Sequence, residues 1–160
     1  MSVVKKLTKV GAKNLSQKLD NLKNIDREQI IKDIEHARSL GDLKENAEYH
    51  AAKESQRLLE KRIAHLEGLL SSVQVIDVDQ IADTKVVSFG LTVTLLNLDN
   101  DREVIYQIVG ADESDLKVAK ISDESPIAQA LLGKSLGDQV DITIPSGTIS
   151  YEIQKIEKVV

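Results

Sequence analysis

The hydrophobic pattern divides the chain into two halves with different periods. In the first half, apolar residues recur every three or four positions, as on one face of a helix. Along its later part, steps of three and four alternate as in a coiled-coil seam, at Ala52, Gln56, Leu59, Ile63, Leu66, Leu70 and Val73. From about Val86 the apolar residues instead alternate with polar ones, which is typical of strands. The sequence therefore predicts a helical part followed by a small sheet-containing part.

An earlier set of apolar residues predicts a helical arm that pairs with this seam. The set falls into two groups whose phase differs by one position, namely Leu15, Leu19, Leu22 and then Ile30, Ile34, Ala37. The shift falls at residues 24–26, where Asp26 and Gln29 have the spacing of an N-cap and its capping box. We therefore expect a break in the helix, or a skip in the seam, at that point.

The link between the two arms is short and predicts an antiparallel hairpin. Gly41 follows Leu40 and suits the residue with positive φ that commonly ends a helix, and Asp42 can cap the next helix. Short connections favour antiparallel neighbours. The second arm, about 30 residues at 1.5 Å each, would reach roughly 45 Å. A heptad pair can also be a dimerisation element, but a loop that turns the chain back favours an intramolecular pair, and we expect a monomer.

The second half predicts antiparallel strands with one short helix. Alternating apolar residues mark strands around residues 89–95, 104–109, 140–144 and 149–153. The helix is marked by Ser125 as its N-cap, Pro126 at its first position and Gly133 just beyond its end. We therefore predict an α+β fold of two domains, with a coiled-coil hairpin over residues 1–77 and a sheet domain over residues 78–160.

Composition and charge narrow the class of protein. The chain has no cysteine, which fits a reducing cytoplasm and removes thiolate sites. No apolar run approaches the ~18 residues that a membrane helix needs, so we expect a cytoplasmic protein without a membrane partner. A net charge of −5 and only 2% aromatic residues argue against a general grip on nucleic acid, although a local basic patch is compatible with both.

Two acids at the expected turn, Asp42 and Glu45, are the candidate functional residues, and their spacing allows two interpretations. In the first, Asp-x-x-Glu at a helix start is an ordinary capping box near the positive end of the helix dipole. In the second, the two carboxylates form half of a hard oxygen site for Mg²⁺, which a partner molecule completes. A cap alone does not explain the exposed Leu43 between the acids.

Cations flank these acids along the chain. Arg38 lies one turn before Asp42, and Lys53 lies about two turns after Glu45. They are either ordinary solubilising charge or a local grip on the end of an RNA strand. The three histidines lack the spacing of a zinc helix, and we expect them to serve as surface or packing residues.

The run from Gly41 to Glu54 closely resembles the hairpin tip of the bacterial Gre transcript-cleavage factors. The resemblance extends over nearly the whole chain, through Phe89-Gly90-Leu91-Thr92-Val93, Tyr106-Gln107-Ile108-Val109-Gly110, Ser125-Pro126-Ile127-Ala128 and Leu132-Gly133-Lys134. The sequence Ala47-Glu48-Tyr49-His50-Ala51-Ala52 resembles the GreA branch more than the basic GreB branch. One departure is Lys53, where arginine is also common, so that charge is kept without a bidentate phosphate contact.

The resemblance implies a function. In that family the hairpin enters the secondary channel of bacterial RNA polymerase, and tip acids matched here by Asp42 and Glu45 help to bind the second Mg²⁺ of the polymerase active site. The polymerase then hydrolyses backtracked RNA, whose 3′ segment contacts a basic patch matched here by Arg38 and Lys53. The second domain is implied to be FKBP-like and to dock on the polymerase.

We accordingly expect an accessory factor of RNA polymerase rather than an enzyme, with Mg²⁺ shared with the polymerase and none bound tightly by the factor alone. Two other functions stay open from the sequence. One is a channel-binding regulator that stimulates no cleavage. The other is an FKBP-like prolyl isomerase with a helical appendage, although few aromatic residues are present in the second half to line a proline pocket.

Overall fold

The computed structural model describes residues 4–159 and separates into two compact units. Residues 12–73 form a helical unit, and the segments before residue 12 and after residue 73 together form a sheet-containing unit. The two segments of the sheet unit meet because strand β1, Lys6–Thr8, pairs in parallel with strand β2, Gln74–Ile76. The fold is therefore α+β, as predicted.

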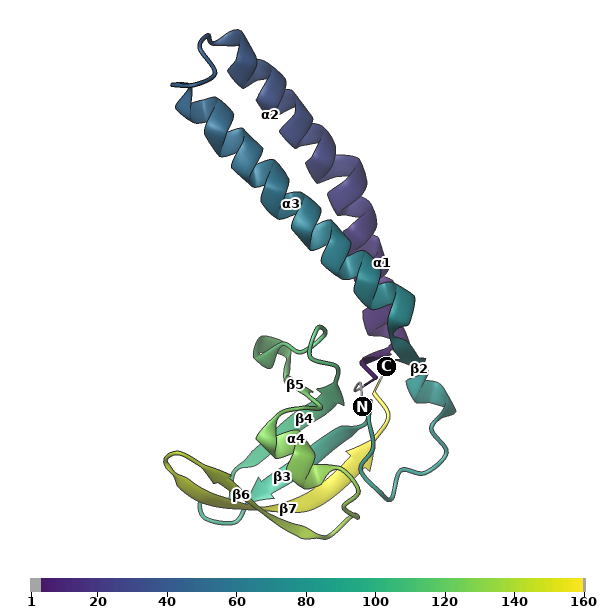
Figure 1. The fold of residues 1–160 in the computed structure, drawn as a ribbon. Helices are drawn as coiled ribbons and strands as arrows, with labels where there is room; N and C mark the ends of the chain where they lie inside the picture. The colour runs from purple at the N-terminus through teal and green to yellow at the C-terminus, as the bar shows by residue number, and fades with distance from the viewer. Residues whose placement is uncertain (1–3, 160) are drawn as a thin grey trace. The chain divides into compact units, whose positions relative to one another are not determined.

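The helical unit is a hairpin of two long arms (Figure 1). One arm runs through α1, Lys9–Asn21, a π-helical segment, Leu22–Asp26, and α2, Arg27–Ser39. The returning arm is α3, Ala47–Ser72, a single helix of 26 residues. The predicted seam is confirmed, because its members from the two arms pack into one buried cluster of Leu19, Leu22, Leu59, Ile63 and Leu66.

The phase shift in the first arm arises from the π-helical segment. A π turn closes hydrogen bonds over five residues and so adds one residue to the helix without ending it. The predicted skip in the seam is therefore confirmed at this place. The predicted capping box is wrong, because Asp26 has helical φ and ψ of −66° and −42° and makes no side-chain capping bond. Gln29 instead donates to Asp33 at 2.9 Å, one turn along the same helix.

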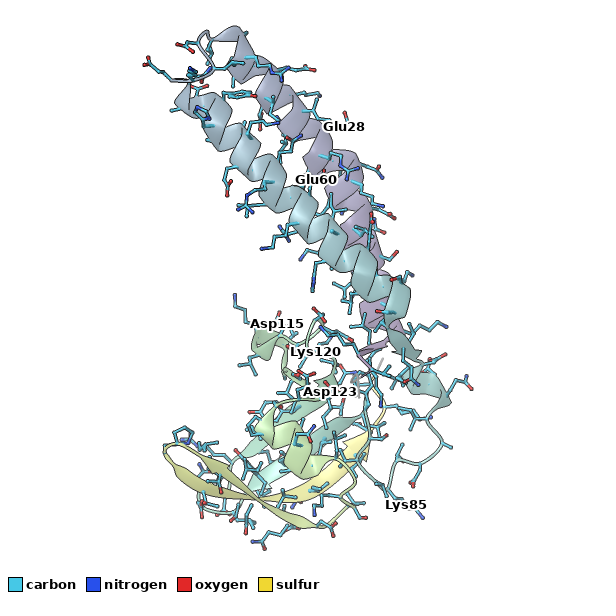
Figure 2. All side chains as sticks on the ribbon, in the orientation of Figure 1. Glu28, Glu60, Lys85, Asp115, Lys120 and Asp123 are labelled. Atoms are coloured by element: carbon cyan, nitrogen blue, oxygen red, sulfur yellow. The ribbon has the colours of Figure 1, made fainter. Side chains whose placement is uncertain are left out.

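Two ion pairs join the arms beside the seam. The guanidinium of Arg27 donates to both carboxylate oxygens of Glu60, at 2.8 and 2.9 Å, and Glu60, labelled in Figure 2, thereby raises the pKa of Arg27. Lys23 and Glu67 approach to 2.6 Å. Such exposed pairs contribute little to stability. The buried seam, rather than these pairs, sets which residues of the two arms face each other.

A five-stranded sheet forms the larger part of the other unit, in the order β5-β4-β3-β7-β6 (Figure 1). The strands are β3, Thr92–Asn97; β4, Glu103–Val109; β5, Lys120–Ser122; β6, Gln139–Ile144; and β7, Gly147–Glu157. Central strand β3 pairs antiparallel with β4 and with β7, and a bulge falls between Thr94 and Leu95. The twist that a bulge adds curls the sheet.

The sheet is mixed rather than purely antiparallel, because β5 runs parallel to β4. The prediction of an antiparallel sheet is therefore wrong at this edge. The predicted strands also omitted β1, β2 and β5, each of three residues. Strands this short show too few alternations for a period of two to be recognised.

The short helix α4, Pro126–Leu131, covers one face of the sheet (Figure 1). Its predicted start and end are confirmed, since Ser125 accepts a capping bond from the Ala128 N–H and Gly133 has a φ of +84°. Ala128 and Leu131 are fully buried among residues of the sheet. Apart from the Tyr151 hydroxyl the buried cluster is apolar, so burial of apolar surface is the main term that stabilises the unit.

Candidate metal-donating tip

The loop between α2 and α3 carries the two candidate acids. Asp42 and Glu45 both have exposed side chains. Leu43 between them is 41% exposed, and Leu40 before them is 55% exposed. The loop therefore presents carboxylates together with apolar side chains to whatever the tip meets.

The structure separates Asp42 from the start of α3. Its Oδ1 atom accepts a hydrogen bond from the backbone N–H of Lys44 at 2.9 Å, two residues on, which is an Asx turn within the loop. The helix begins later, at Ala47, and its N-cap is Asn46, whose side chain accepts from the Tyr49 N–H at 3.0 Å. The predicted capping role of Asp42 is therefore wrong, and a capping box no longer accounts for Glu45.

Asn46 and His50 are the tip residues that the sequence analysis missed. Besides capping α3, the Asn46 carboxamide donates to the backbone carbonyl of Ala37 in α2 at 2.6 Å. The Nε2 atom of His50 lies 2.9 Å from the carbonyl oxygen of Lys44, and since a carbonyl only accepts, the ring nitrogen is the donor. An available signal was Asn directly before Ala47-Glu48, which is a favoured cap with an acid in the first turn.

The two candidate cations lie on the helices that flank the loop. Arg38, in the last turn of α2, is exposed, and its guanidinium carbon lies 5.9 Å from the centre of the Tyr49 ring. Lys53, in the second turn of α3, is exposed and donates from Nζ to Gln56 Oε1 at 3.2 Å. The Tyr49 ring restricts the Arg38 side chain by a cation–π contact.

The oxygen atoms of the tip acids are donors that suit a hard metal ion. Within residues 4–159, no group of three or more histidine, aspartate or glutamate side chains is arranged to hold a metal. Carboxylate oxygens are the donors that Mg²⁺ prefers, and Mg²⁺ keeps waters and other ligands when only one or two carboxylates bind it. Asp42 and Glu45 therefore supply the right donor atoms but too few of them for a tight site.

The lining of a hollow of about 550 Å³ in the sheet unit bears on the isomerase alternative. The walls are aliphatic and polar, with Val78, Ile105, Val118, Gln107 and Lys120 among them, and no aromatic side chain contributes. An apolar ligand such as a proline ring would find no aromatic surface there.

Among the described residues, no helix is long and apolar enough to cross a membrane.

Comparison with known proteins defines the class as a transcription elongation factor. Residues 5–75 match the family described as "Transcription elongation factor, N-terminal", and residues 82–158 match "Transcription elongation factor, GreA/GreB, C-term". Together these matches span both units, and the chain belongs to the GreA/GreB family.

Two GreA proteins agree with this assignment. The chain is 50% identical to transcription elongation factor GreA of Haemophilus influenzae, over 94% of this chain and 95% of that one. It is 49% identical to GreA of Pseudomonas aeruginosa, over 96% and 97% of the two chains. Among solved structures, GreA factor homolog 1 of Thermus thermophilus is 27% identical, covers 97% of this chain and 99% of that one, and gives a TM-score of 0.44.

Proposed function

We propose that this factor stimulates transcript cleavage by lending the carboxylates of Asp42 and Glu45 to a Mg²⁺ ion in the active site of RNA polymerase. Family membership makes the chain an accessory factor that binds RNA polymerase, and not an enzyme itself. We further propose which residues act, which metal ion they bind and by which route they reach it. The hairpin would enter the secondary channel, and the polymerase would hydrolyse the backtracked RNA with its own catalytic centre.

The observation that carries the proposal is the position of the helix cap. Because Asn46 caps α3, the carboxylates of Asp42 and Glu45 are not needed for that purpose. One oxygen of Asp42 accepts the Lys44 N–H, which holds the carboxylate in one direction, and its second oxygen can still bind a ligand. Two exposed acids on a seven-residue loop, residues 40–46, do not favour stability, since like charges repel each other.

Hydrolysis of the RNA would require little from the factor beyond the carboxylates of Asp42 and Glu45. A second metal ion in phosphodiester hydrolysis activates the attacking water and stabilises developing charge. Asp42 and Glu45 would hold that ion, and either carboxylate could orient the water or accept its proton. The factor would thus contribute and position metal ligands, while the polymerase would stabilise the leaving oxygen.

Arg38 and Lys53 would contact the 3′ segment of the backtracked RNA. Phosphate contacts fix the position of a strand without reading its sequence. Arg38 is directed by the Tyr49 ring and can make a bidentate contact, while Lys53 acts as a point charge. Replacement of either by alanine should slow cleavage more than it weakens binding to polymerase.

The remaining parts follow from the same proposal. We assign docking on the polymerase to residues 78–160 as an FKBP-like domain, and entry into the channel to the hairpin of residues 1–77. The apolar seam is buried within one chain, by residues such as Leu59, Ile63 and Leu66, which supports a monomer. The second candidate function is a channel-binding regulator without cleavage, and the exposed Leu43 at the tip is the feature that would suit binding alone.

Cleavage of RNA in a stalled, backtracked bacterial polymerase complex tests the proposal. Wild type, Asp42→Asn and Glu45→Gln are compared in Mg²⁺, with Asp20→Asn on exposed α1 as the matched control. We expect cleavage with wild type and the control, and a loss of 100-fold or more, about the effect of removing a charge-stabilising group, in both tip variants. Competition for polymerase should be equal for all four. Cleavage unchanged in the tip variants would contradict the role of the two acids, and no cleavage with wild type would favour the regulator instead.

A further inference from the structure

The acidic loop is closed by side chains rather than by its own backbone alone. Asn46 bonds in two directions: its Oδ1 accepts from the Tyr49 N–H at the start of α3, and its Nδ2 donates to the Ala37 carbonyl near the end of α2. Ala37 is nine residues earlier in the chain and only 1% exposed. One carboxamide therefore ties together the two helix ends from which the loop emerges.

The bond to Ala37 connects the start of α3 to the other arm of the hairpin. The distance of 2.6 Å is short for a neutral N–H···O bond. The Ala37 carbonyl also accepts the Leu40 N–H at 3.1 Å, so the Asn46 carboxamide occupies its second lone pair. Asn46 is half-buried, so its surroundings restrict the rotation of its side chain. These features are more than an N-cap needs, since a serine would cap α3 as well.

A second contact closes the loop from the same helix. The His50 ring donates to the Lys44 carbonyl, two residues after the Asp42 carboxylate and one before Glu45. Gly41 opens the loop with a φ of +125°, and a side chain at this position would strain the turn. The loop between Gly41 and Asn46 is thus held at both ends and near its middle.

We infer that Asn46 is a positioning residue for the reaction, which holds the loop so that Asp42 and Glu45 are presented to the metal in one arrangement. The inference rests on the proposed function of these acids. Groups that hold metal ligands in place commonly contribute 10- to 100-fold to metal affinity or activity, because small displacements of reacting groups slow a reaction strongly. Asn46 itself needs no contact with metal or RNA.

Two substitutions separate capping from loop closure. Asn46→Asp and Asn46→Ser both keep an oxygen that can cap α3. Asp loses the N–H that reaches the Ala37 carbonyl, and Ser is too short to reach it. Asp adds a negative charge whereas Ser does not, so an effect shared by both cannot come from charge. Asn14→Asp and Asn14→Ser, on an exposed part of α1, are the matched controls.

The first test is made on the free full-length protein by NMR. In wild type and in the Asn14 variants, we expect backbone order parameters of residues 42–45 near those of the flanking helices, above roughly 0.8. In Asn46→Asp and Asn46→Ser they should fall to about 0.6 or below. The Tyr49 amide should stay protected from exchange, which shows that α3 still begins there. Unchanged loop order in both variants would overturn the inference.

The second test is the Mg²⁺ concentration that gives half-maximal cleavage in the backtracked polymerase complex. Both Asn46 variants should need about tenfold more Mg²⁺ than wild type, with equal competition for polymerase. An unchanged Mg²⁺ requirement would also overturn the positioning role, even if the loop had loosened. Failure of the proposed function looks different: Asp42→Asn would then cleave as well as wild type, whatever the NMR result.

Discussion

The carboxylate of Glu113 binds Thr8 through both of its oxygens, although 105 residues separate them. Oε1 accepts the Thr8 N–H at 2.9 Å, and Oε2 accepts the Thr8 hydroxyl at 2.6 Å. The same hydroxyl oxygen accepts the backbone N–H of Gly11 at 3.0 Å, in the first turn of α1. Thr8 is thus the N-cap of α1, and Glu113 fixes that cap to the loop after β4.

Thr8→Val should destabilise the sheet unit by about 1–3 kcal/mol. Valine has nearly the shape of threonine but leaves the Gly11 N–H and one Glu113 oxygen without their partner, and Thr8 is only 2% exposed. The free energy of opening, measured by hydrogen exchange at the amide of Val93 in β3, reports the change. Thr143→Val, at an exposed position of β6, should leave it within about 0.5 kcal/mol. A similar small effect at Thr8 would contradict this description of the cap.

Gly110 and Gly68 should respond to alanine with opposite signs. A Cβ atom at Gly110 would overlap the backbone carbonyl oxygen of Lys6 in β1. Backbone cannot swing away as a long side chain can, so we expect a loss of about 2–3 kcal/mol. Gly68, inside α3, has no atom within 4 Å of a built Cβ, and alanine there should add about 0.5–1 kcal/mol through helix propensity. Urea unfolding followed at helical and sheet amides separates the two effects.

Asp123 gives the sheet unit a pH dependence. Burial raises the pKa of this carboxyl above its ordinary 3.8, and the nearby charge of Glu124 adds to the shift. Asp123, labelled in Figure 2, follows β5. The folded protein holds the Asp123 proton more tightly than the unfolded chain does. Ionisation of Asp123 therefore lowers the free energy of unfolding at pH values above its folded pKa, and has no effect at pH values below its unfolded pKa. Ionised Asp123 therefore weakens the fold at neutral pH.

Asp123→Asn should accordingly stabilise the protein at pH 7, and the gain should vanish as the pH falls below about 3.8. Unfolding by urea across this range measures the difference between variant and wild type. Glu103→Gln, at the exposed start of β4, shows the effect of removing one surface charge from the same unit. A gain that persisted unchanged at low pH would mean that the asparagine acts by a new hydrogen bond and not by removal of the buried charge.

The hairpin was predictable because its signal is long. Repeated steps of three and four over the second arm determine the buried face, and the shift in the first arm predicted the skip in the seam that the π-helical segment produces. Local patterns were misleading at the caps within the hairpin. Asp26 and Gln29 have capping-box spacing, yet the helix continues through them because the seam on both sides stays buried against α3.

The tip shows why a cap can be misplaced from sequence alone. Asp42 and Asn46 are both favoured N-caps, and each precedes residues that can be helical. What selects Asn46 is the carbonyl of Ala37 on the other arm, and its position depends on the hairpin having formed. The parallel edge strand β5 and the β1–β2 pair were missed because strands of three residues show too few alternations to be recognised.

The most direct test of the central claim is metal rescue of Asp42→Cys in the backtracked polymerase complex. The chain has no cysteine of its own, so the new thiolate is unique within it. Mg²⁺ binds thiolates poorly, whereas softer divalent ions accept them. We predict that the variant fails to stimulate cleavage in Mg²⁺ and regains it in Mn²⁺, while Asp42→Ser regains none and polymerase without factor shows only its own response to Mn²⁺. Equal cleavage by Asp42→Cys and wild type in Mg²⁺, or no difference between cysteine and serine in Mn²⁺, would contradict a metal ligand at Asp42.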